Sequence, residues 1–327
     1  MNVGANQLKG WIPIRLYWNE STPVIDWCWV GTRRFTDPFF SQTIDATLRL
    51  PFSTLFRPQT PIDTLQERHE IESGMQPRGF IFHMSRCGST LVSQMLASLP
   101  RSVVIAEAGP IDSVLRAHFQ DPSLTEEMRA QWLKWMISGL GQRRDENAQY
   151  LFIKFDTWSV FDLPLIHRTY PGVPWIFLYR DPIDVLVSQF EQRGAHMVPG
   201  AIEPELFGMT LDEVVAMEPE EYCSSVLARV CEAALQHSKN YGGMLINYLQ
   251  LPEAVRTHIL DLFGVEVSVS EMEVLERVAM MDSKNPSFAF VEDSKRNKKG
   301  ATEAMRAAVA KFLSPIYEQL EAVRLGT

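Results

Sequence analysis

From about residue 77 onward, hydrophobic positions form short apolar runs that alternate with segments in which they recur at helical spacing. This alternation is typical of βαβ units, which build a parallel sheet. Strands are predicted at residues 79–84, 102–107, 150–155, 174–180 and, as a fifth candidate, 244–249. The pattern indicates an α/β fold in which a parallel β-sheet is flanked by helices.

The residues that start and stop the helices support the same fold. Helices are predicted over 89–99, 125–140, 181–193 and 221–240. In the third of these, Asp181 is suited to the N-cap and Pro182 to the first turn. A long C-terminal helix is predicted over residues 301–323, interrupted at Pro315, because proline cannot donate the helical hydrogen bond.

Residues 1–70 differ from the rest of the chain and are predicted to form a small β-rich appendage. Two strand-like runs, "WIPIRLYW" at 11–18 and "VIDWCWV" at 24–30, flank a turn-prone segment, which predicts a hairpin. Four tryptophans lie in these runs. They could line a ligand site, but core packing of a small subdomain is the favoured interpretation.

The remainder, residues 71–327, is predicted to be one large domain. Within it, residues 194–220 interrupt the βαβ pattern with glycine, proline and scattered apolar positions. This segment could be a mobile lid or an ordinary surface excursion that leads into the next helix.

Composition narrows the possible partners. The chain of 327 residues has 31 Lys and Arg against 40 Asp and Glu, a net charge of -9, and backbone-phosphate affinity needs clustered cations, so no nucleic-acid partner is expected. It contains no apolar stretch long enough to span a bilayer, so no membrane partner is expected. The N-terminal residues lack a secretory pattern and the four cysteines lack metal-type spacing, which together favour a cytoplasmic protein.

An anion-binding loop is predicted at residues 83–90, "HMSRCGST", which follow the first apolar run and open a helix. Backbone N–H groups at a helix N-terminus carry partial positive charge and bind phosphate. A loop for ATP or GTP has lysine directly after its glycine, whereas here Ser89 follows Gly88 and the nearest cation is Arg86. Nucleoside triphosphate chemistry is therefore disfavoured.

Charged residues end three of the other predicted strands: Glu107, Lys154 and Arg180. The carboxyl ends of parallel strands meet at the edge that carries the loop, so these side chains are expected to converge there. Any one of them could instead end a strand merely to meet water. Ser188, about two helical turns beyond Arg180, could help it grip a second phosphate, which suggests a nucleotide with phosphates at two positions.

These residues resemble motifs of the sulfotransferases that use 3′-phosphoadenosine 5′-phosphosulfate (PAPS). "SRCGST" at 85–90 resembles the family's 5′-phosphosulfate loop, and "FLYRDPIDVLVS" at 177–188 resembles its 3′-phosphate motif. "KRNKKG" at 295–300 more loosely resembles a loop that closes over the 3′-phosphate, but it could also be a solvated basic turn. The resemblance covers roughly residues 77–327 and implies a P-loop fold with no metal site.

The resemblance also implies roles for individual residues. Glu107, 21 residues after Arg86, is similar to the catalytic glutamate of the tyrosylprotein sulfotransferases, and Lys154 is similar to their catalytic lysine. Arg86, Glu107 and Lys154 are thus the expected catalytic residues. The expected donor-binding residues are Arg86, Cys87, Gly88, Ser89, Thr90, Arg180, Ser188, Lys298, Lys299 and Gly300.

The loop at 83–90 departs from the family's pattern at two positions, and it contains a second candidate for the catalytic base. Cys87 stands where serine is commoner, and Arg86 stands where cytosolic members have lysine. His83 could act as the base, as a histidine does in the cytosolic members, but a structural hydrogen bond is its expected role.

The resemblance implies transfer of a sulfuryl group from PAPS to a hydroxyl of a small molecule or peptide, with release of adenosine 3′,5′-bisphosphate. The alternatives are an ATP-dependent phosphotransferase and a non-catalytic nucleotide-binding module. Glu107 would take the acceptor's proton, either late in the transfer or with a pKa raised by the closed site. Residues 11–29 and 194–220 could cover the acceptor, which would favour an apolar or aromatic alcohol.

Overall fold

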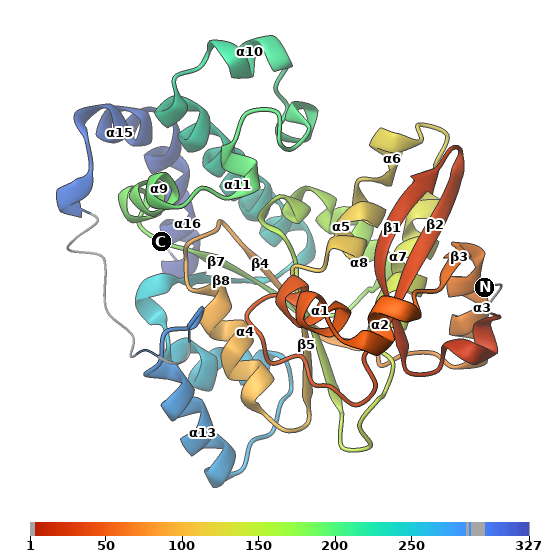
Figure 1. Cartoon of the computed structure of the whole chain (residues 1–327). Helices are drawn as coiled ribbons and strands as arrows, with labels where there is room; N and C mark the ends of the chain where they lie inside the picture. Colours follow the sequence, from red (N-terminus) through yellow and green to blue (C-terminus); the bar gives the residue numbers. More distant parts are fainter. Residues whose placement is uncertain (1–3, 286–287, 289–297, 327) are drawn as a thin grey trace.

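A computed structural model describes residues 4–285, 288 and 298–326. Its centre is a five-stranded parallel sheet in the order β5-β6-β4-β7-β8 (Figure 1). The strands are β4 (Pro77–His83), β5 (Ser102–Ala106), β6 (Tyr150–Lys154), β7 (Trp175–Tyr179) and β8 (Met244–Asn247). All five predicted strands are present and run parallel, which confirms the predicted fold class.

The register of this sheet brings the strand ends to one edge. Lys154, the last residue of β6, pairs with Ile81 of β4 and with Ala106, the last residue of β5. His83, the last residue of β4, pairs with Leu178 of β7. The segments that follow these strands therefore begin side by side at the carboxyl edge, where ligands bind in open parallel sheets.

Helices cover both faces of the sheet. In Figure 1, α4 and α13 lie below the sheet and α9 and α11 above it. Asp181 caps α9 as predicted, accepting hydrogen bonds from the N–H groups of Ile183 and Asp184. The helices are α1 (Phe40–Leu48), α2 (Pro51–Leu55), α3 (Asp63–Ile71), α4 (Ser89–Ser98), α5 (Gly109–Leu115), α6 (Ala117–Gln120), α7 (Glu126–Leu140), α8 (Leu163–Thr169), α9 (Pro182–Glu191), α10 (Leu211–Ala216), α11 (Pro219–Tyr241), α12 (Leu260–Leu262), α13 (Val269–Ala279), α15 (Glu303–Ala308) and α16 (Ser314–Leu325).

The C-terminal helix is interrupted just before the predicted position. A π-helical turn, Val309–Leu313, joins α15 to α16, and Pro315 lies in the first turn of α16. At the start of a helix the missing N–H of proline costs no helical hydrogen bond.

The N-terminal residues, called the N-terminal unit below, contain the predicted hairpin in a small antiparallel sheet and also the helices α1, α2 and α3. An antiparallel hairpin of β1 (Trp11–Asn19) and β2 (Thr22–Trp29) is extended by β3 (Gln59–Pro61). Trp27 is fully buried and donates a hydrogen bond to Thr60, and the ring of Trp18 packs 6.4 Å from that of Trp132 in α7. The small sheet therefore shares a hydrophobic core with the main part of the chain. Among the helices of the described residues, none has both the length and the apolar character needed to cross a bilayer.

Candidate active site

A cavity of about 610 Å³ opens at the carboxyl edge of the central sheet. Its walls come from the β4–α4 loop, from residues that follow the other strands, and from two later segments, 192–196 and 281–284. Lys154 lies behind the wall and reaches two of its residues through the ammonium group. The predicted site residues that line the cavity are Arg86, Cys87, Gly88, Ser89, Thr90, Glu107, Arg180 and Ser188.

The β4–α4 loop presents backbone N–H groups to the cavity. Gly88 caps α4 in the left-handed conformation (φ 84°), and a Cβ there would lie 2.6 Å from a methyl carbon of Leu251, so only glycine fits. The first N–H groups of α4, from Ser89 onward, have no intrahelical acceptor and carry partial positive charge. This end of the cavity is therefore built to hold an anion.

Cys87 contributes its backbone rather than its thiol. The buried Sγ donates a hydrogen bond to the carbonyl of Leu178, and burial raises the thiol pKa to about 12. A neutral thiol facing the core is inert, so replacement of the usual serine by cysteine leaves the loop's anion-binding groups in place.

Backbone strain is concentrated at this site. Four non-glycine residues of the described chain have positive φ, and three of them, Ser85 (74°), Arg86 (49°) and Glu107 (52°), lie on the cavity. Each such conformation costs about 1–3 kcal/mol and persists only where the surroundings hold it. Here Gln189 donates a hydrogen bond to Ser85, and the Arg86 guanidinium donates to the carbonyl and side chain of Gln192. The end of α9 thus clamps the loop.

A compact polar cluster joins the ends of three strands. The Lys154 ammonium lies 2.6 Å from Glu107 Oε1 and donates to Thr90 Oγ1 at 3.3 Å. The Lys154 side chain is 1% exposed, whereas Glu107 retains 23% of its surface toward the cavity. An ammonium has three N–H donors, so these contacts leave one for a ligand oxygen.

The ionisation of Glu107 follows from these neighbours. Burial alone would raise its pKa, but the adjacent Lys154 ammonium and the hydrogen bond with His83 outweigh burial and hold the pKa well below its usual range. The expectation that the site raises the pKa of Glu107 is therefore wrong, because this pKa is lowered. Such a carboxylate is a weak base. It suits the second expectation for Glu107, that it takes the acceptor's proton late in the transfer.

The imidazole of His83 lies beside this carboxylate. Its Nδ1 accepts a hydrogen bond from the Ser85 N–H at 3.0 Å, and its Nε2 lies 3.4 Å from Glu107 Oε1. Burial lowers the pKa of His83, and so does the Lys154 charge, whereas Glu107 acts in the opposite direction. Because Nδ1 accepts from the Ser85 N–H, the proton of the neutral ring lies on Nε2, toward Glu107. With Nδ1 occupied by the loop backbone, His83 serves the structural role expected from the sequence.

A second cationic group lies where β7 meets α9. The Arg180 guanidinium donates to Asp184 Oδ2 at 3.2–3.3 Å and stacks 4.2 Å from the ring centre of Tyr248. Ser188, two turns along α9, lines the same cavity. The Lys298 ammonium lies 3.4 Å from Asp181, so it reaches the start of α9 beside Arg180.

The other predicted residues of the C-terminal loop are less closely placed. Lys299 and Gly300 are exposed, and neither belongs to the cavity wall formed by the described residues. Residues 295–297 of the same motif lie outside the described residues. The role of Lys298, Lys299 and Gly300 in binding the donor stays a prediction.

Several cavity residues were missed by the sequence reasoning. Lys284 is exposed at the rim, yet its local burial, together with the charges of Arg86 and Lys154, lowers its pKa to about 8. Asp156, two residues after Lys154, has its pKa raised well above the usual range, chiefly by burial and then by Asp112 and Glu107. Its place just after β6 could have identified it, whereas the segment around Lys284 has no recognisable pattern.

The opposite wall is aromatic and weakly polar. The Phe39 ring centre lies 5.1 Å from the Lys154 ammonium. The Trp158 ring lies 5.7 Å from the buried ring of His196, centre to centre, and is tilted by 49° against it. Burial lowers the pKa of His196 to about 3, and neither ring nitrogen has a hydrogen-bond partner among the described residues. His196 belongs to the 194–220 segment, so this predicted covering segment reaches the cavity. The other prediction was wrong, because no residue of 11–29 lines the cavity and the N-terminal unit reaches it through Phe39 instead. None of the four N-terminal tryptophans lines it.

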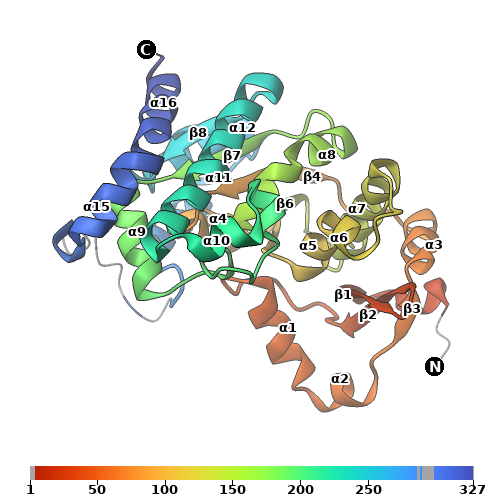
Figure 2. The same ribbon diagram turned by 90° about the horizontal axis from the view of Figure 1, so that it is seen from above.

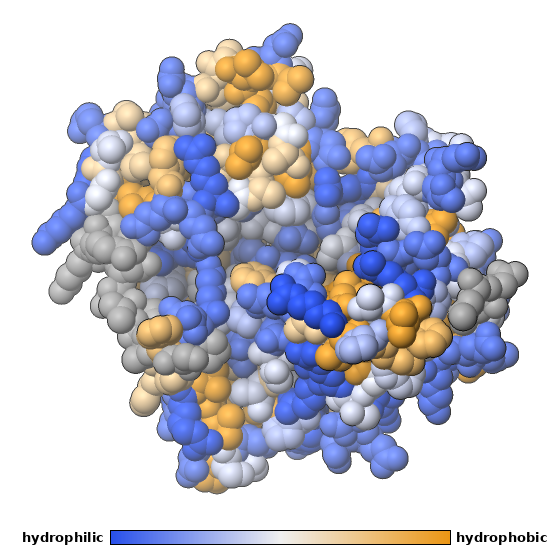
Figure 3. All heavy atoms as spheres, viewed as in Figure 1, coloured by the Kyte–Doolittle hydropathy of each residue, from blue (hydrophilic) through white to orange (hydrophobic). Residues whose placement is uncertain are grey.

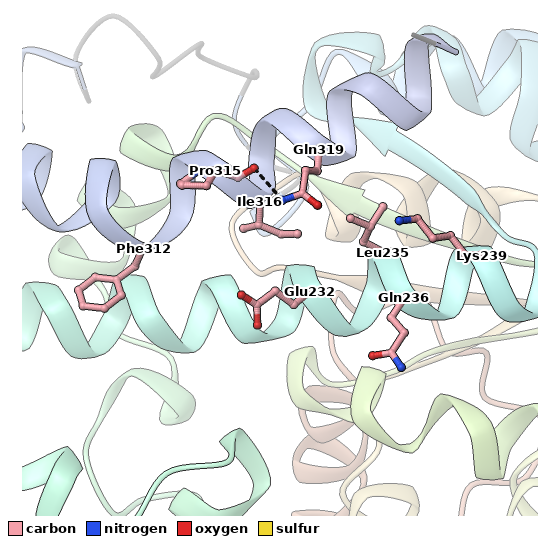
Figure 4. A pocket seen from close by; sticks show the side chains of 8 residues that line it. All are labelled: Glu232, Leu235, Gln236, Lys239, Phe312, Pro315, Ile316 and Gln319. Carbon is pink, nitrogen blue, oxygen red and sulfur yellow. Dashed lines mark hydrogen bonds between the residues drawn. The ribbon is translucent and has the colours of Figure 1, made fainter.

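A separate groove of about 410 Å³ runs between α11 and α16 (Figure 4). Its walls are mixed, with Leu235 and Ile316 beside the charged ends of Glu232 and Lys239. It contains none of the predicted site residues and shares no residue with the larger cavity.

Comparisons with known proteins were made at three levels. Neither the protein-family models nor the curated proteins give a match. Among solved structures, the chain is similar to the sulfotransferase domain from the curacin biosynthetic pathway, with 15% identity and a TM-score of 0.44 over 78% of this chain and 99% of that one.

Two further similarities are of the same kind. A sulfotransferase from Mycobacterium avium gives 10% identity and a TM-score of 0.46 over 77% of this chain and 81% of that one. A sulfotransferase from Alicyclobacillus acidocaldarius gives 16% identity and a TM-score of 0.44 over 76% of this chain and 96% of that one. At these identities and TM-scores, the function of this chain has to be argued from its own residues.

Proposed function

We propose that this protein is a sulfotransferase that moves the sulfuryl group of PAPS to a hydroxyl acceptor and releases adenosine 3′,5′-bisphosphate. The observation that carries the proposal is the arrangement around one cavity. A helix N-terminus with Arg86 lines this cavity, and so do Arg180 and Ser188. Glu107 lines it as well, paired with Lys154 behind the wall. Two anion sites and an acid–base pair fit a nucleotide with phosphates at two positions and a reacting group at one of them.

In this proposal the loop N–H groups and Arg86 hold the 5′-phosphosulfate, while Arg180 and Ser188 hold the 3′-phosphate. The acceptor oxygen forms a bond to sulfur as the bond between sulfur and the bridging phosphate oxygen breaks. The electron pair of that bond stays on the bridging oxygen, where the third N–H of Lys154 stabilises the growing charge. The acceptor proton passes to Glu107. Positioning and charge stabilisation do most of the work, as in phosphoryl transfer.

The acceptor would lie against Phe39, Trp158 and His196. Aromatic rings and an uncharged imidazole favour a neutral molecule that presents its hydroxyl from an apolar or aromatic body, either a small molecule or a peptide side chain.

Binding of adenosine 3′,5′-bisphosphate tests the donor site directly. Removing Arg180 entirely would take a charged partner away from the buried Asp184 carboxylate. We therefore choose Arg180→Lys, which keeps the charge and loses the fork of N–H donors. Calorimetry should show affinity weakened roughly ten- to a hundredfold, because bonds to charged groups contribute about 1.5–3 kcal/mol. Arg229→Lys, in an exposed pair on α11, is the matched control.

The same titration separates the alternatives. Tight binding of bisphosphate that does not require magnesium supports the proposal. Preferential binding of ATP with magnesium would replace it with a phosphotransferase, and bisphosphate binding without turnover of PAPS over a panel of alcohols and phenols would leave a binding module.

Donor affinity should also depend on pH through Lys284. Its pKa of about 8 means that the ammonium is charged at pH 7 and largely neutral at pH 9, so bisphosphate binding should weaken roughly three- to tenfold over that range. The ligand's phosphates are almost fully ionised at pH 7, and the small negative charge that they gain up to pH 9 would strengthen binding rather than weaken it. The Lys284→Gln variant should bind the bisphosphate more weakly than wild type at pH 7, and its affinity should not change between pH 7 and pH 9. Lys311→Gln, in an exposed pair with Glu221, should show the same affinity and the same pH dependence as wild type. Identical slopes in wild type and Lys284→Gln would exclude Lys284 from the donor site.

A further inference from the structure

An exposed apolar patch lies on the N-terminal unit, well apart from the groove between α11 and α16. Figure 3 shows it as a hydrophobic area over α2, with strongly hydrophilic side chains at its border. Eight of the nine residues from Arg49 to Arg57 are exposed, and Leu55 is 77% exposed. We call this surface the α2 patch; it consists of Trp11, Trp29, Leu50, Phe52, Leu55 and Phe56.

The rings of this patch hold one another in place at the surface. Trp11 lies 5.9 Å from both Trp29 and Phe52, and Phe52 lies 5.0 Å from Phe56. Aromatic rings gathered and left in water are costly, and contiguous exposed apolar areas usually mark a binding surface. Figure 2 shows α1 and α2 at the outer edge of the molecule, where a flat surface could reach them without meeting the rest of the fold.

Cations border the α2 patch. Arg49 and Arg57 flank it in the sequence, Lys9 precedes the glycine that packs on the Trp29 ring, and Arg33 contacts α1; all four are exposed. Residues 1–60 carry six Lys and Arg against four Asp and Glu, although the whole chain has a charge of -9. The apolar patch therefore lies in a part of the chain with net positive charge, although the whole protein is acidic.

Exposed apolar side chains on α10 show that a border of cations is not a general feature of apolar areas on this protein. Leu211 and Val215 of α10 are 55% and 72% exposed, but their neighbours Asp212, Glu213 and Glu218 are acidic. Both surfaces expose apolar side chains, but the charges beside them are opposite. They provide a matched pair for experiment.

We propose that the α2 patch binds anionic phospholipid membranes, with Leu55, Phe52 and Trp29 entering the interface and the bordering cations contacting lipid phosphates. Apolar and tryptophan side chains beside Lys and Arg are the combination that favours such peripheral binding. A second copy of this chain is a less suitable partner for the α2 patch. In a twofold dimer through this patch, the four bordering cations of one copy would face those of the other. Peripheral contact needs no spanning segment, so it is compatible with the lack of one among the described helices. This proposal does not depend on the sulfotransferase assignment.

The patch is also joined to the cavity. Phe39, on the cavity wall, is the residue directly before α1, and α1 leads into α2. A helix of nine residues spans about 13 Å, so a membrane at the α2 patch would lie close to the aromatic half of the cavity.

Vesicle co-sedimentation tests the proposal. The full chain should pellet with vesicles of phosphatidylcholine mixed with phosphatidylserine and should bind vesicles of phosphatidylcholine alone much more weakly. Leu55→Ser should weaken binding to the mixed vesicles roughly tenfold, and Arg57→Gln roughly fivefold. Val215→Ser, at a similarly exposed apolar residue with acidic neighbours, should bind as wild type. Added salt should weaken binding of wild type more than that of Arg57→Gln.

Each other outcome overturns the proposal. Binding that Leu55→Ser and Val215→Ser reduce equally would show no specific surface. Absence of vesicle binding, with a concentration-dependent dimer that Leu55→Ser dissociates, would assign the α2 patch to self-association. Thermal melting of each variant confirms that it is folded, and Leu55 is exposed enough that its replacement should not change the melting temperature.

Discussion

Replacing Glu107 by glutamine should lower turnover roughly 10²- to 10⁴-fold, the usual contribution of a general base. Glutamine keeps the shape of the side chain, which matters because Glu107 has a positive φ, but it cannot accept the acceptor's proton. Affinity for adenosine 3′,5′-bisphosphate should stay the same or increase, because a negative charge is removed beside the donor site. Steady-state assays with PAPS and calorimetry with the bisphosphate measure the two effects.

The control must distinguish lost chemistry from lost folding. Glu276→Gln removes a carboxylate from an exposed ion pair with Arg256 and should leave both turnover and binding unchanged. If Glu107→Gln keeps more than a tenth of wild-type turnover while binding is intact, Glu107 is not the base. His196→Gln and Asp156→Asn, on the same cavity, would then be the next variants to assay.

The residues at the strand ends could be placed from the sequence because a parallel sheet brings its carboxyl ends to one edge. Glu107, Lys154 and Arg180 each follow an apolar run, and the register of the sheet places them on or behind one cavity. The loop with Gly88 could also be predicted, because its glycine and the start of the following helix are neighbours in the sequence. Such features depend only on residues near in sequence.

Residues brought in by long-range packing could not be placed in this way. Phe39 reaches the Lys154 ammonium from the N-terminal unit, and Lys284 reaches the cavity from the segment after α13. Nothing in the local pattern around either residue marks it. The direction of the Glu107 pKa was also beyond the sequence, because it depends on a Lys154 contact of 2.6 Å that outweighs burial.

Lys154→Met should give the largest change in stability. It removes the cation and leaves the Glu107 carboxylate in a mostly buried place, where breaking one side of an ion pair costs roughly 3–5 kcal/mol. The lower end of that range is expected because Glu107 keeps 23% of its surface exposed. Urea unfolding measures the loss. Turnover should fall with it, since no ammonium remains to stabilise the leaving phosphate oxygen.

The pH dependence of that loss has a definite sign. In wild type the folded-state pKa of Glu107 is depressed, so its contribution to stability is present above the unfolded pKa of about 4.3 and is lost as pH falls. Without Lys154, burial becomes the dominant influence and the pKa rises above the unfolded value. The variant should therefore be least destabilised near pH 5, where the carboxyl can take up a proton, and most destabilised at pH 7.

A double variant separates charge burial from loss of packing. Lys154→Met with Glu107→Gln removes both charges, so it should regain much of the stability lost by Lys154→Met alone and should lose the extra pH dependence. Arg168→Met, which breaks an exposed pair with Glu126, should cost less than about 1 kcal/mol at either pH. If Lys154→Met is equally destabilised at pH 5 and pH 7 and the double variant recovers nothing, the pair at the strand ends does not set the charge of Glu107. The carboxylate would then be free to act as a base of ordinary strength.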